Sequence, residues 1–122
     1  MDCVFCALAS GEIPTDVVGH DEAAVAFLDQ SPKSPGHTLV VPRRHVADLA
    51  EDSTALVEIA PLLAELSASI PERLGAAGVN LQVNSGVAAG QEVFHLHVHV
   101  VPRYDEGRAP EGTDGVRRAL GL

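Results

Sequence analysis

Residues 94–102 have the sequence FHLHVHVVP, and this stretch decides the fold. Side chains alternate between the two faces of a β-strand, so His95, His97 and His99 are expected on one face, about 7 Å apart in succession. The leucine and valines between them are expected to point into the core. Three histidines at regular alternation inside an apolar strand are unusual for an ordinary core or surface, so the pattern predicts a functional site.

Two kinds of chemistry fit this run of histidines. Alternate histidines on a strand can aim two imidazole ligands at one metal ion. A neutral imidazole is also a nucleophile at neutral pH, and a protonated imidazole donates hydrogen bonds to phosphate oxygens. The residues alone leave both a metal site and catalysis on phosphorus open.

The sequence on either side predicts four further strands and one long helix. The strands are expected at residues 17–18, 23–28, 37–41 and 79–83, and the histidine strand at 94–101. Apolar residues at helical spacing predict a helix from 53 to about 76, in which Pro61 and Pro71 predict either a kink or two shorter helices. A short helical turn is expected at 4–10, and the tail at 104–122 shows no clear element. This order predicts an antiparallel α+β domain with one main helix.

The composition narrows the classes of function. The chain has 122 residues, 46% of them hydrophobic, which predicts a single domain spanning residues 1–122. A net charge of −9 disfavours binding to a long nucleic acid, although local backbone N–H groups can still hold one small phosphate. The sequence has neither an apolar run of the roughly 20 residues that a membrane helix needs nor a recognisable secretory signal. We therefore expect a cytoplasmic protein with reduced thiols, and neither a nucleic acid nor a membrane as partner.

Cys3 and Cys6 form a Cys-x-x-Cys pair. Such a pair can be a redox couple, two free buried thiols, or half of a zinc site whose other ligands are distant in sequence. A redox couple of the thioredoxin type would follow a strand, and none is predicted before Cys3. The spacing by itself does not choose among these interpretations.

Four blocks of sequence share a specific order and spacing. They are residues 95–101; 3–6 with 11–14; 27–29 with 35–45; and 84–86 with 90–93. Together they resemble the histidine triad (HIT) family, whose signature is His-x-His-x-His-x-x with apolar x, and in particular its bacterial Hint-like branch. The resemblance runs from residue 3 to about residue 104 and leaves 104–122 as a variable C-terminal tail. It implies a five-stranded antiparallel sheet with one main helix, which pairs with a second copy into a ten-stranded sheet in a homodimer.

The resemblance implies an enzyme that binds a purine nucleotide of the AMP type and hydrolyses a bond to its α-phosphate. His97 would attack phosphorus in line and form a nucleotidyl-histidine intermediate, which water resolves. His99 would hold the α-phosphate oxygens, and His37 and His95 would complete the polar network. The implied substrates are nucleoside phosphoramidates or related adenylates. The alternatives are a dinucleoside polyphosphate hydrolase and a nucleotide-binding regulatory protein with little activity.

The resemblance also assigns nucleotide contacts. Asp29 would bind the ribose hydroxyls, although by itself it also fits a turn residue. The apolar walls around the base would be Phe5, Val18, Phe27 and Leu39. The phosphate side would be formed by Asn84, the Gly90 backbone and Gln91. Glu92 stands where many Hint enzymes place a serine near the leaving group, and a carboxylate there could repel phosphate or assist a basic leaving group.

The same resemblance supplies further ligands for the cysteine pair. Some bacterial HIT proteins complete such a site with two histidines, which correspond here to His45 and His95. The implied site is a structural zinc ion held by Cys3, Cys6, His45 and His95, with no open coordination position. In that case His95 supports His97 as a metal ligand and does not act as an acid or base.

Overall fold

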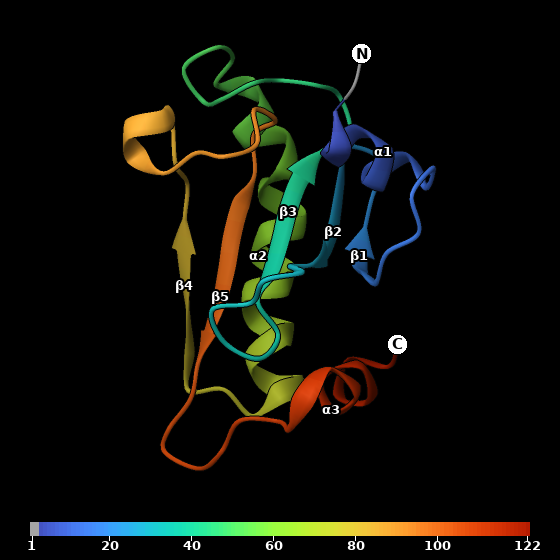
Figure 1. Ribbon diagram of the computed structural model, residues 1–122, viewed down its shortest axis with the longest axis vertical. Helices are drawn as coiled ribbons and strands as arrows, with labels where there is room; N and C mark the ends of the chain where they lie inside the picture. The colour runs from blue at the N-terminus through green and yellow to red at the C-terminus, as the bar shows by residue number, and fades with distance from the viewer. Residues whose placement is uncertain (1–2) are drawn as a thin grey trace.

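Five antiparallel strands form one sheet in the order β1-β2-β3-β5-β4 (Figure 1). The computed structural model describes residues 3–122. The strands are β1 (Val17–His20), β2 (Ala24–Leu28), β3 (Thr38–Pro42), β4 (Gly78–Gln82) and β5 (Val98–Arg103). The helices are α1 (Val4–Ser10), α2 (Thr54–Leu74) and α3 (Gly112–Leu120), with a 3-10 turn, η1, at Val87–Ala89. The predicted five-stranded α+β fold with one main helix is confirmed.

Helix α2 covers one face of the sheet and forms the larger core. Its buried residues recur at helical spacing and are Ala55, Ile59, Leu62, Leu66, Ile70 and Leu74. Ile59 and Ile70 are fully buried, and burying a side chain of this size contributes about 1.5–3 kcal/mol. By length and apolar composition α2 would also suit a membrane span, but its buried residues pack on the sheet, as in the core helix of a globular domain.

The structure resolves the two alternatives for this helix. Pro61 and Pro71 both lie inside α2, which continues as one helix, so the alternative of two shorter helices is wrong. The N-cap residue is Ser53, and the preceding Asp52 accepts hydrogen bonds from the backbone N–H of Thr54 at 2.9 Å and from its hydroxyl at 2.6 Å. The helix ends at Gly75, whose φ of 73° is in the left-handed region that favours glycine.

Helix α1 packs on the opposite face of the sheet. Phe5 and Ala9 of α1 contact a set of alternate strand residues, namely Val25, Phe27, Leu39 and Val41. The strand register places Phe27 opposite Leu39, and Leu39 opposite His99. An apolar row on this face therefore leads from beneath α1 directly to the histidines.

Strand β5 begins at Val98, four residues later than predicted. The backbone N–H of Leu96 donates to the carbonyl of Val46 at 2.6 Å, so this segment is bonded to a loop instead of a neighbouring strand. His95 and His97 consequently lie in an irregular segment before β5, and His99 lies within the strand. The expected alternation of all three histidines along one strand is wrong, and His95 turns to a different set of side chains.

The tail contains a helix that the sequence did not predict. Val116 and Leu120 of α3 are buried against the α2 core, and Arg117 Nε donates to Asp16 at 2.9 Å. The segment is short and contains Gly112 and Gly115, residues of low helix propensity. Contacts with the rest of the fold, which the local sequence does not encode, therefore stabilise α3.

Candidate active site

A cavity of about 440 Å³ lies between α1, the ends of β2 and β3, the loop at residues 84–93 and the histidine segment. This volume is within the usual range for small-molecule sites. One part of the wall is apolar and includes Phe5, Leu8, Phe27, Leu39 and Val93. The other part is polar and includes Asp29, His37, Asn84, His97 and His99. The cavity can therefore enclose an apolar group at one end and a polar or charged group at the other.

Hydrogen bonds fix the tautomers of two histidines on the polar wall. The backbone N–H of Lys33 donates to Nδ1 of His37 at 3.0 Å, so neutral His37 carries its proton on Nε2. That Nε2 donates to Nδ1 of His99 at 2.9 Å, which places the proton of His99 on its own Nε2. His99 lines the cavity, so it presents an N–H that can donate to a bound group.

A separate hydrogen bond orients His97. Nδ1 of His97 donates to the backbone carbonyl of His95 at 2.8 Å, so the lone pair of neutral His97 is on Nε2. The ring stands edge-on to Phe5, with centroids 5.0 Å apart at an interplanar angle of 88°. Its centroid is also 5.0 Å from that of His99. The hydrogen bond to the His95 carbonyl and the packed ring of Phe5 thus hold His97 in the cavity wall. Its neutral imidazole can act as a nucleophile.

Burial favours the neutral forms of the surrounding histidines. It lowers the pKa of His99 to about 4, and the neighbouring rings of His97 and His37 add to the effect. Burial also lowers the pKa of His37, although the carboxylate of Asp29 opposes this shift. A neutral imidazole has one N–H and one lone pair, which is what the chain of hydrogen bonds requires.

Asp29 both closes a turn and faces the cavity. Its Oδ1 accepts from the backbone N–H of Ser31 at 2.8 Å, as in an Asx turn. Its Oδ2 lies 3.4 Å from Nε2 of His37. Each carboxylate oxygen can accept a second hydrogen bond, so Asp29 keeps acceptor capacity toward the cavity. The two interpretations from the sequence, turn residue and ligand contact, are compatible.

Asp29, His37 and His99 are close enough together to suggest a metal site. The proton on Nε2 of His37 argues against it. The nitrogen of His37 that faces the other two residues is Nε2, and the bond from Lys33 leaves the proton there. A metal ligand needs a lone pair at that atom. We therefore interpret this group as a hydrogen-bonding chain.

Gln91 does not reach the cavity, contrary to its assignment as a phosphate contact. Its amide group donates to the carbonyl of Ala47 at 2.7 Å and to that of Val93 at 3.1 Å. Its Oε1 accepts from the backbone N–H of Gly86 at 2.8 Å. Both amide hydrogens are therefore used within the protein, and a phosphate oxygen, which can only accept, has no partner there. Gln91 instead stabilises the loop at residues 84–93 through these hydrogen bonds.

The other predicted residues of the phosphate side, Asn84, Gly90 and Glu92, do line the cavity. The N–H of Gly90 donates to the carbonyl of Val87 at 3.0 Å, so it is used within η1 and is not directed at a ligand. Gly90 has a φ of 96°, and a Cβ there would lie 3.5 Å from Nδ2 of Asn84. That distance is an ordinary van der Waals contact, so the left-handed backbone conformation, and not crowding of Asn84, favours glycine here. Glu92 is exposed to solvent.

Three of the four predicted apolar wall residues meet at the cavity. Phe5, Phe27 and Leu39 all line it, and the rings of Phe5 and Phe27 pack edge to face at 5.5 Å. Val18 does not line the cavity, because it packs against the α2 core on the opposite face of the sheet. The register shift between residues 17 and 19 of β1 disturbs the pairing near this position. The prediction that Val18 belongs to the apolar wall of the cavity is therefore wrong.

Cys3, Cys6, His45 and His95 form a second cluster beside the cavity. Nδ1 of His95 lies 3.4 Å from each sulfur, and Nδ1 of His45 lies 3.4 Å from the sulfur of Cys6. Sulfur and nitrogen ligands of one tetrahedral zinc ion would lie about 3.6 Å apart at ordinary bond lengths. The spacing and chemistry of these four side chains therefore fit a closed metal site.

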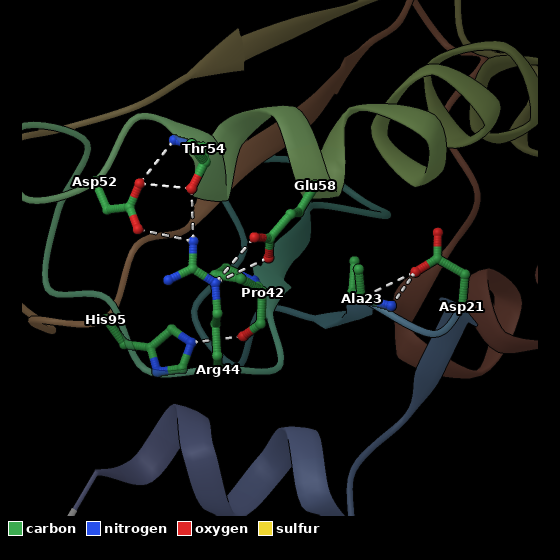
Figure 2. Close-up of polar contacts among 9 residues, drawn as sticks. Asp21, Ala23, Pro42, Arg44, Asp52, Thr54, Glu58 and His95 are labelled. Atoms are coloured by element: carbon green, nitrogen blue, oxygen red, sulfur yellow. Dashed lines mark hydrogen bonds and ion pairs between the residues drawn. The ribbon is translucent and has the colours of Figure 1, made fainter.

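His95 connects the cluster to the cavity. Its Nε2 donates to the carbonyl of Pro42 at 2.8 Å (Figure 2). The lone pair on Nδ1 therefore faces the cysteines. A backbone carbonyl commonly fixes a metal-binding histidine in this way. The carbonyl of the same residue accepts the hydrogen bond that orients His97. His95 is therefore a candidate metal ligand that also sets the tautomer of the candidate nucleophile.

Arg44 ties the segment that carries His45 to the start of α2 (Figure 2). Its Nε donates to Glu58 at 2.9 Å, and its terminal nitrogen lies 3.0 Å from both the Thr54 hydroxyl and the Asp52 carboxylate. These side chains are partly exposed, so the ion pairs add little to stability. Their effect is geometric, because they hold the backbone next to His45.

The sequence reasoning missed several residues that line the cavity, and Leu8 and Lys33 are two that bear on the site's geometry. Leu8 lines the apolar wall, and its position three residues after Phe5 on a helix was a signal that could have found it. Lys33 lines the cavity and fixes His37, but it does so through its backbone N–H, which no side-chain motif reveals.

The fold and the site together define a small α+β protein with a histidine-lined cavity, and comparisons with known proteins give its family. Residues 10–106 match the HIT domain. The Arabidopsis thaliana protein named adenylylsulfatase HINT3 is 38% identical over 103 residues, which cover 84% of this chain and 52% of that protein. The chain belongs to the HIT family.

Two crystal structures of family members share the whole fold. A hypothetical histidine triad nucleotide-binding protein of Sulfolobus tokodaii superposes with a TM-score of 0.86 at 32% identity, covering 98% of this chain and 87% of that one. A zinc-bound histidine triad family protein from Mycobacterium smegmatis superposes with a TM-score of 0.84 at 36% identity, covering 99% and 94%.

Proposed function

We propose that the chain is a nucleotide hydrolase that cleaves a bond to the α-phosphate of an AMP-type purine nucleotide, with His97 as the nucleophile. The observation that carries the proposal is the hydrogen bond from Nδ1 of His97 to the carbonyl of His95. It leaves a lone pair on Nε2 of a residue that lines the cavity. A covalent intermediate on this nitrogen divides one difficult displacement into two easier ones.

In the first step, Nε2 of His97 attacks the α-phosphorus in line. A P–N bond forms as the bond to the leaving group breaks. The leaving group takes the electron pair, and an amine leaving group also takes a proton from solvent. The imidazole then carries a positive charge, which the bond from Nδ1 to the carbonyl of His95 stabilises. Nε2–H of His99 donates to a phosphoryl oxygen as negative charge builds up. In the second step, water attacks phosphorus and releases a proton to solvent, the P–N bond breaks, and His97 regains its lone pair.

The remaining wall residues bind the rest of the nucleotide. The carboxylate of Asp29 accepts hydrogen bonds from the ribose hydroxyls. Phe5, Phe27 and Leu39 enclose the base. The Asn84 amide donates to the phosphate, and Glu92 faces the leaving group, where its charge favours a basic amine over an anion. This arrangement supports nucleoside phosphoramidates or related adenylates as the substrates, and the name of the Arabidopsis relative supports the latter class.

Parallel assays of three substrate classes test this function. We expect faster AMP release from adenosine 5′-phosphoramidates or from adenylyl sulfate than from diadenosine polyphosphates, compared by kcat/KM. Preference for diadenosine polyphosphates would instead identify a dinucleoside polyphosphate hydrolase. AMP binding without turnover of any of the three would identify a nucleotide-binding regulatory protein and contradict the proposal.

We also propose that Cys3, Cys6, His45 and His95 hold one structural zinc ion. Support comes from the fit of the four donor atoms and from the zinc-bound relative of M. smegmatis. Such an ion would link α1 to the segments of the two histidines. Phe5 lies between the two cysteines on α1 and contacts His97, so the site would also hold part of the cavity wall.

Zinc analysis and chelation test this proposed site. Protein purified without added metal should contain about one zinc ion per chain. Chelation should lower the melting temperature and weaken AMP binding, because α1 loses its metal link to the segments of His45 and His95 and keeps only its packing on the sheet. Cys6→Ser should behave like the chelated protein, and Ser10→Ala, an exposed control on the same helix, should not. Metal-free protein with an unchanged melting temperature would contradict the proposal.

The homodimer expected from the family resemblance remains a proposal. Strand β4 lies at the edge of the sheet, and its Leu81 is half exposed. Val57 on α2 is 71% exposed. Pairing of two copies through these elements would cover apolar surface and join the two sheets into one of ten strands.

A further inference from the structure

Two hydroxyl groups that the proposed mechanism does not use hold the loop before β3. Ser34 Oγ donates to the carbonyl of Pro102 at 2.6 Å, and the hydroxyl of Tyr104 donates to the carbonyl of Pro35 at 2.6 Å. Both distances are at the short end of the usual range for O–H···O bonds. Pro102 belongs to β5, and Tyr104 directly follows that strand. The strand that carries His99 therefore also anchors this loop.

Packing leaves the loop little freedom to move. The ring of Tyr104 is partly buried against the core cluster that α2 forms with the sheet. Burial raises the pKa of Tyr104 to about 12, so its hydroxyl keeps the proton that it donates at neutral pH. Gly36 has a φ of 87°, and a Cβ there would collide with Leu74 of α2. The loop is therefore packed closely against the end of α2.

The anchored loop contains the backbone donor that fixes the tautomer of His37. The N–H of His37 donates to the carbonyl of Ser34 at 3.1 Å, which closes a turn. The N–H of Lys33, one residue before Ser34, donates to Nδ1 of His37 at 3.0 Å. A backbone N–H can only donate, so it excludes a proton from this nitrogen. The proton on Nε2 of His37 then determines which nitrogen of His99 is protonated.

We propose that Ser34 and Tyr104 are positioning residues that keep the proton of His99 on Nε2, acting through the loop and His37. This inference rests on the proposed nucleotide hydrolase and deepens it, because that N–H is the group that donates to a phosphoryl oxygen. Asp29 Oδ2 lies 3.4 Å from Nε2 of His37 and also attracts the proton there, over more than an ordinary hydrogen-bond distance. Loss of the loop anchors should therefore give a mixture of tautomers.

NMR chemical shifts of the imidazole nitrogens in the ligand-free protein test this directly. The wild type should show His99 protonated on Nε2, with its signals assigned by their absence from His99→Ala. In the double variant Ser34→Ala/Tyr104→Phe, a second form of His99 with its proton on Nδ1 should appear. Tyr104→Phe alone keeps the packing of the ring and should show a smaller amount of the same form, which maintains the test if the double variant does not fold.

Ser67→Ala is the matched control for these substitutions. The Ser67 hydroxyl also donates to a backbone carbonyl, that of Leu63 at 2.7 Å, but it does so within α2. Its removal should leave the tautomer of His99 unchanged. The same second form of His99 in Ser67→Ala would overturn the inference, because the change would then report general loosening of the fold.

Turnover of adenosine 5′-phosphoramidate supplies a second readout. The kcat of the double variant should fall about five- to tenfold, as for the weakening of one hydrogen bond, while AMP affinity stays within about twofold of wild type. An unchanged tautomer of His99 in a folded double variant would overturn the inference, as would unchanged kcat. A wild type without turnover would overturn the proposed hydrolase, whereas the tautomer measurement, which needs no substrate, would still decide the role of the two hydroxyls.

Discussion

His97→Ala is expected to lower turnover by several orders of magnitude while AMP affinity stays within about tenfold of wild type. The substitution removes the nitrogen that forms the covalent bond to phosphorus. It leaves Asp29 and the apolar wall in place, so the contacts that hold the ground state remain. Single-turnover kinetics with adenosine 5′-phosphoramidate, together with AMP titration, measure the two quantities separately.

His20→Ala is a matched control for this substitution. His20 is exposed on β1 and does not line the cavity, so its replacement should leave turnover unchanged. The melting temperature of His97→Ala should show that the variant is folded. Near-wild-type turnover of a folded His97→Ala protein would exclude His97 as the nucleophile.

His99→Ala is expected to have the second largest effect, a loss of kcat/KM on the order of a hundredfold. It removes one donor to the phosphoryl oxygens but leaves the nucleophile, and losses of this size follow the removal of a single such donor. Loss of the partner of His37 adds to the disturbance, since Nε2 of His37 donates to Nδ1 of His99. A change of less than about twofold would show that His99 does not stabilise the transition state.

The pH dependence of this loss identifies the form of His99 that acts. Burial lowers its pKa to about 4, so between pH 6 and 8 the ring is neutral and donates through Nε2. The ratio of wild-type to His99→Ala kcat/KM should therefore be constant over this range. A ratio that grows steadily as the pH falls would instead indicate that imidazolium is the active form.

The sequence predicted the fold well because the decisive signals were local. Apolar runs bounded by turn residues predicted the strands, and apolar residues at helical spacing predicted α2. The start of β5 was wrong, because the bond between Leu96 and Val46 joins segments 50 residues apart. Helix α3 was missed because its stability depends on burial of Val116 and Leu120 against a distant core.

The same distinction between local and distant contacts applies to the site. From the family resemblance we predicted that Asp29, His97 and His99 belong to one site, and all three line the cavity. The resemblance did not reveal that the amide hydrogens of Gln91 are already used within the protein, because that depends on partners as far away as Ala47.

Trapping the covalent intermediate tests the central claim most directly. Adenosine 5′-phosphoramidate labelled in the α-phosphate is mixed with the enzyme, quenched within one turnover and digested without acid, and the peptides are analysed by mass spectrometry. We predict an acid-labile adenylyl group on His97, and none in the His97→Ala protein. An adenylyl group on His99, or complete turnover with no modified peptide at any quench time, would contradict the account.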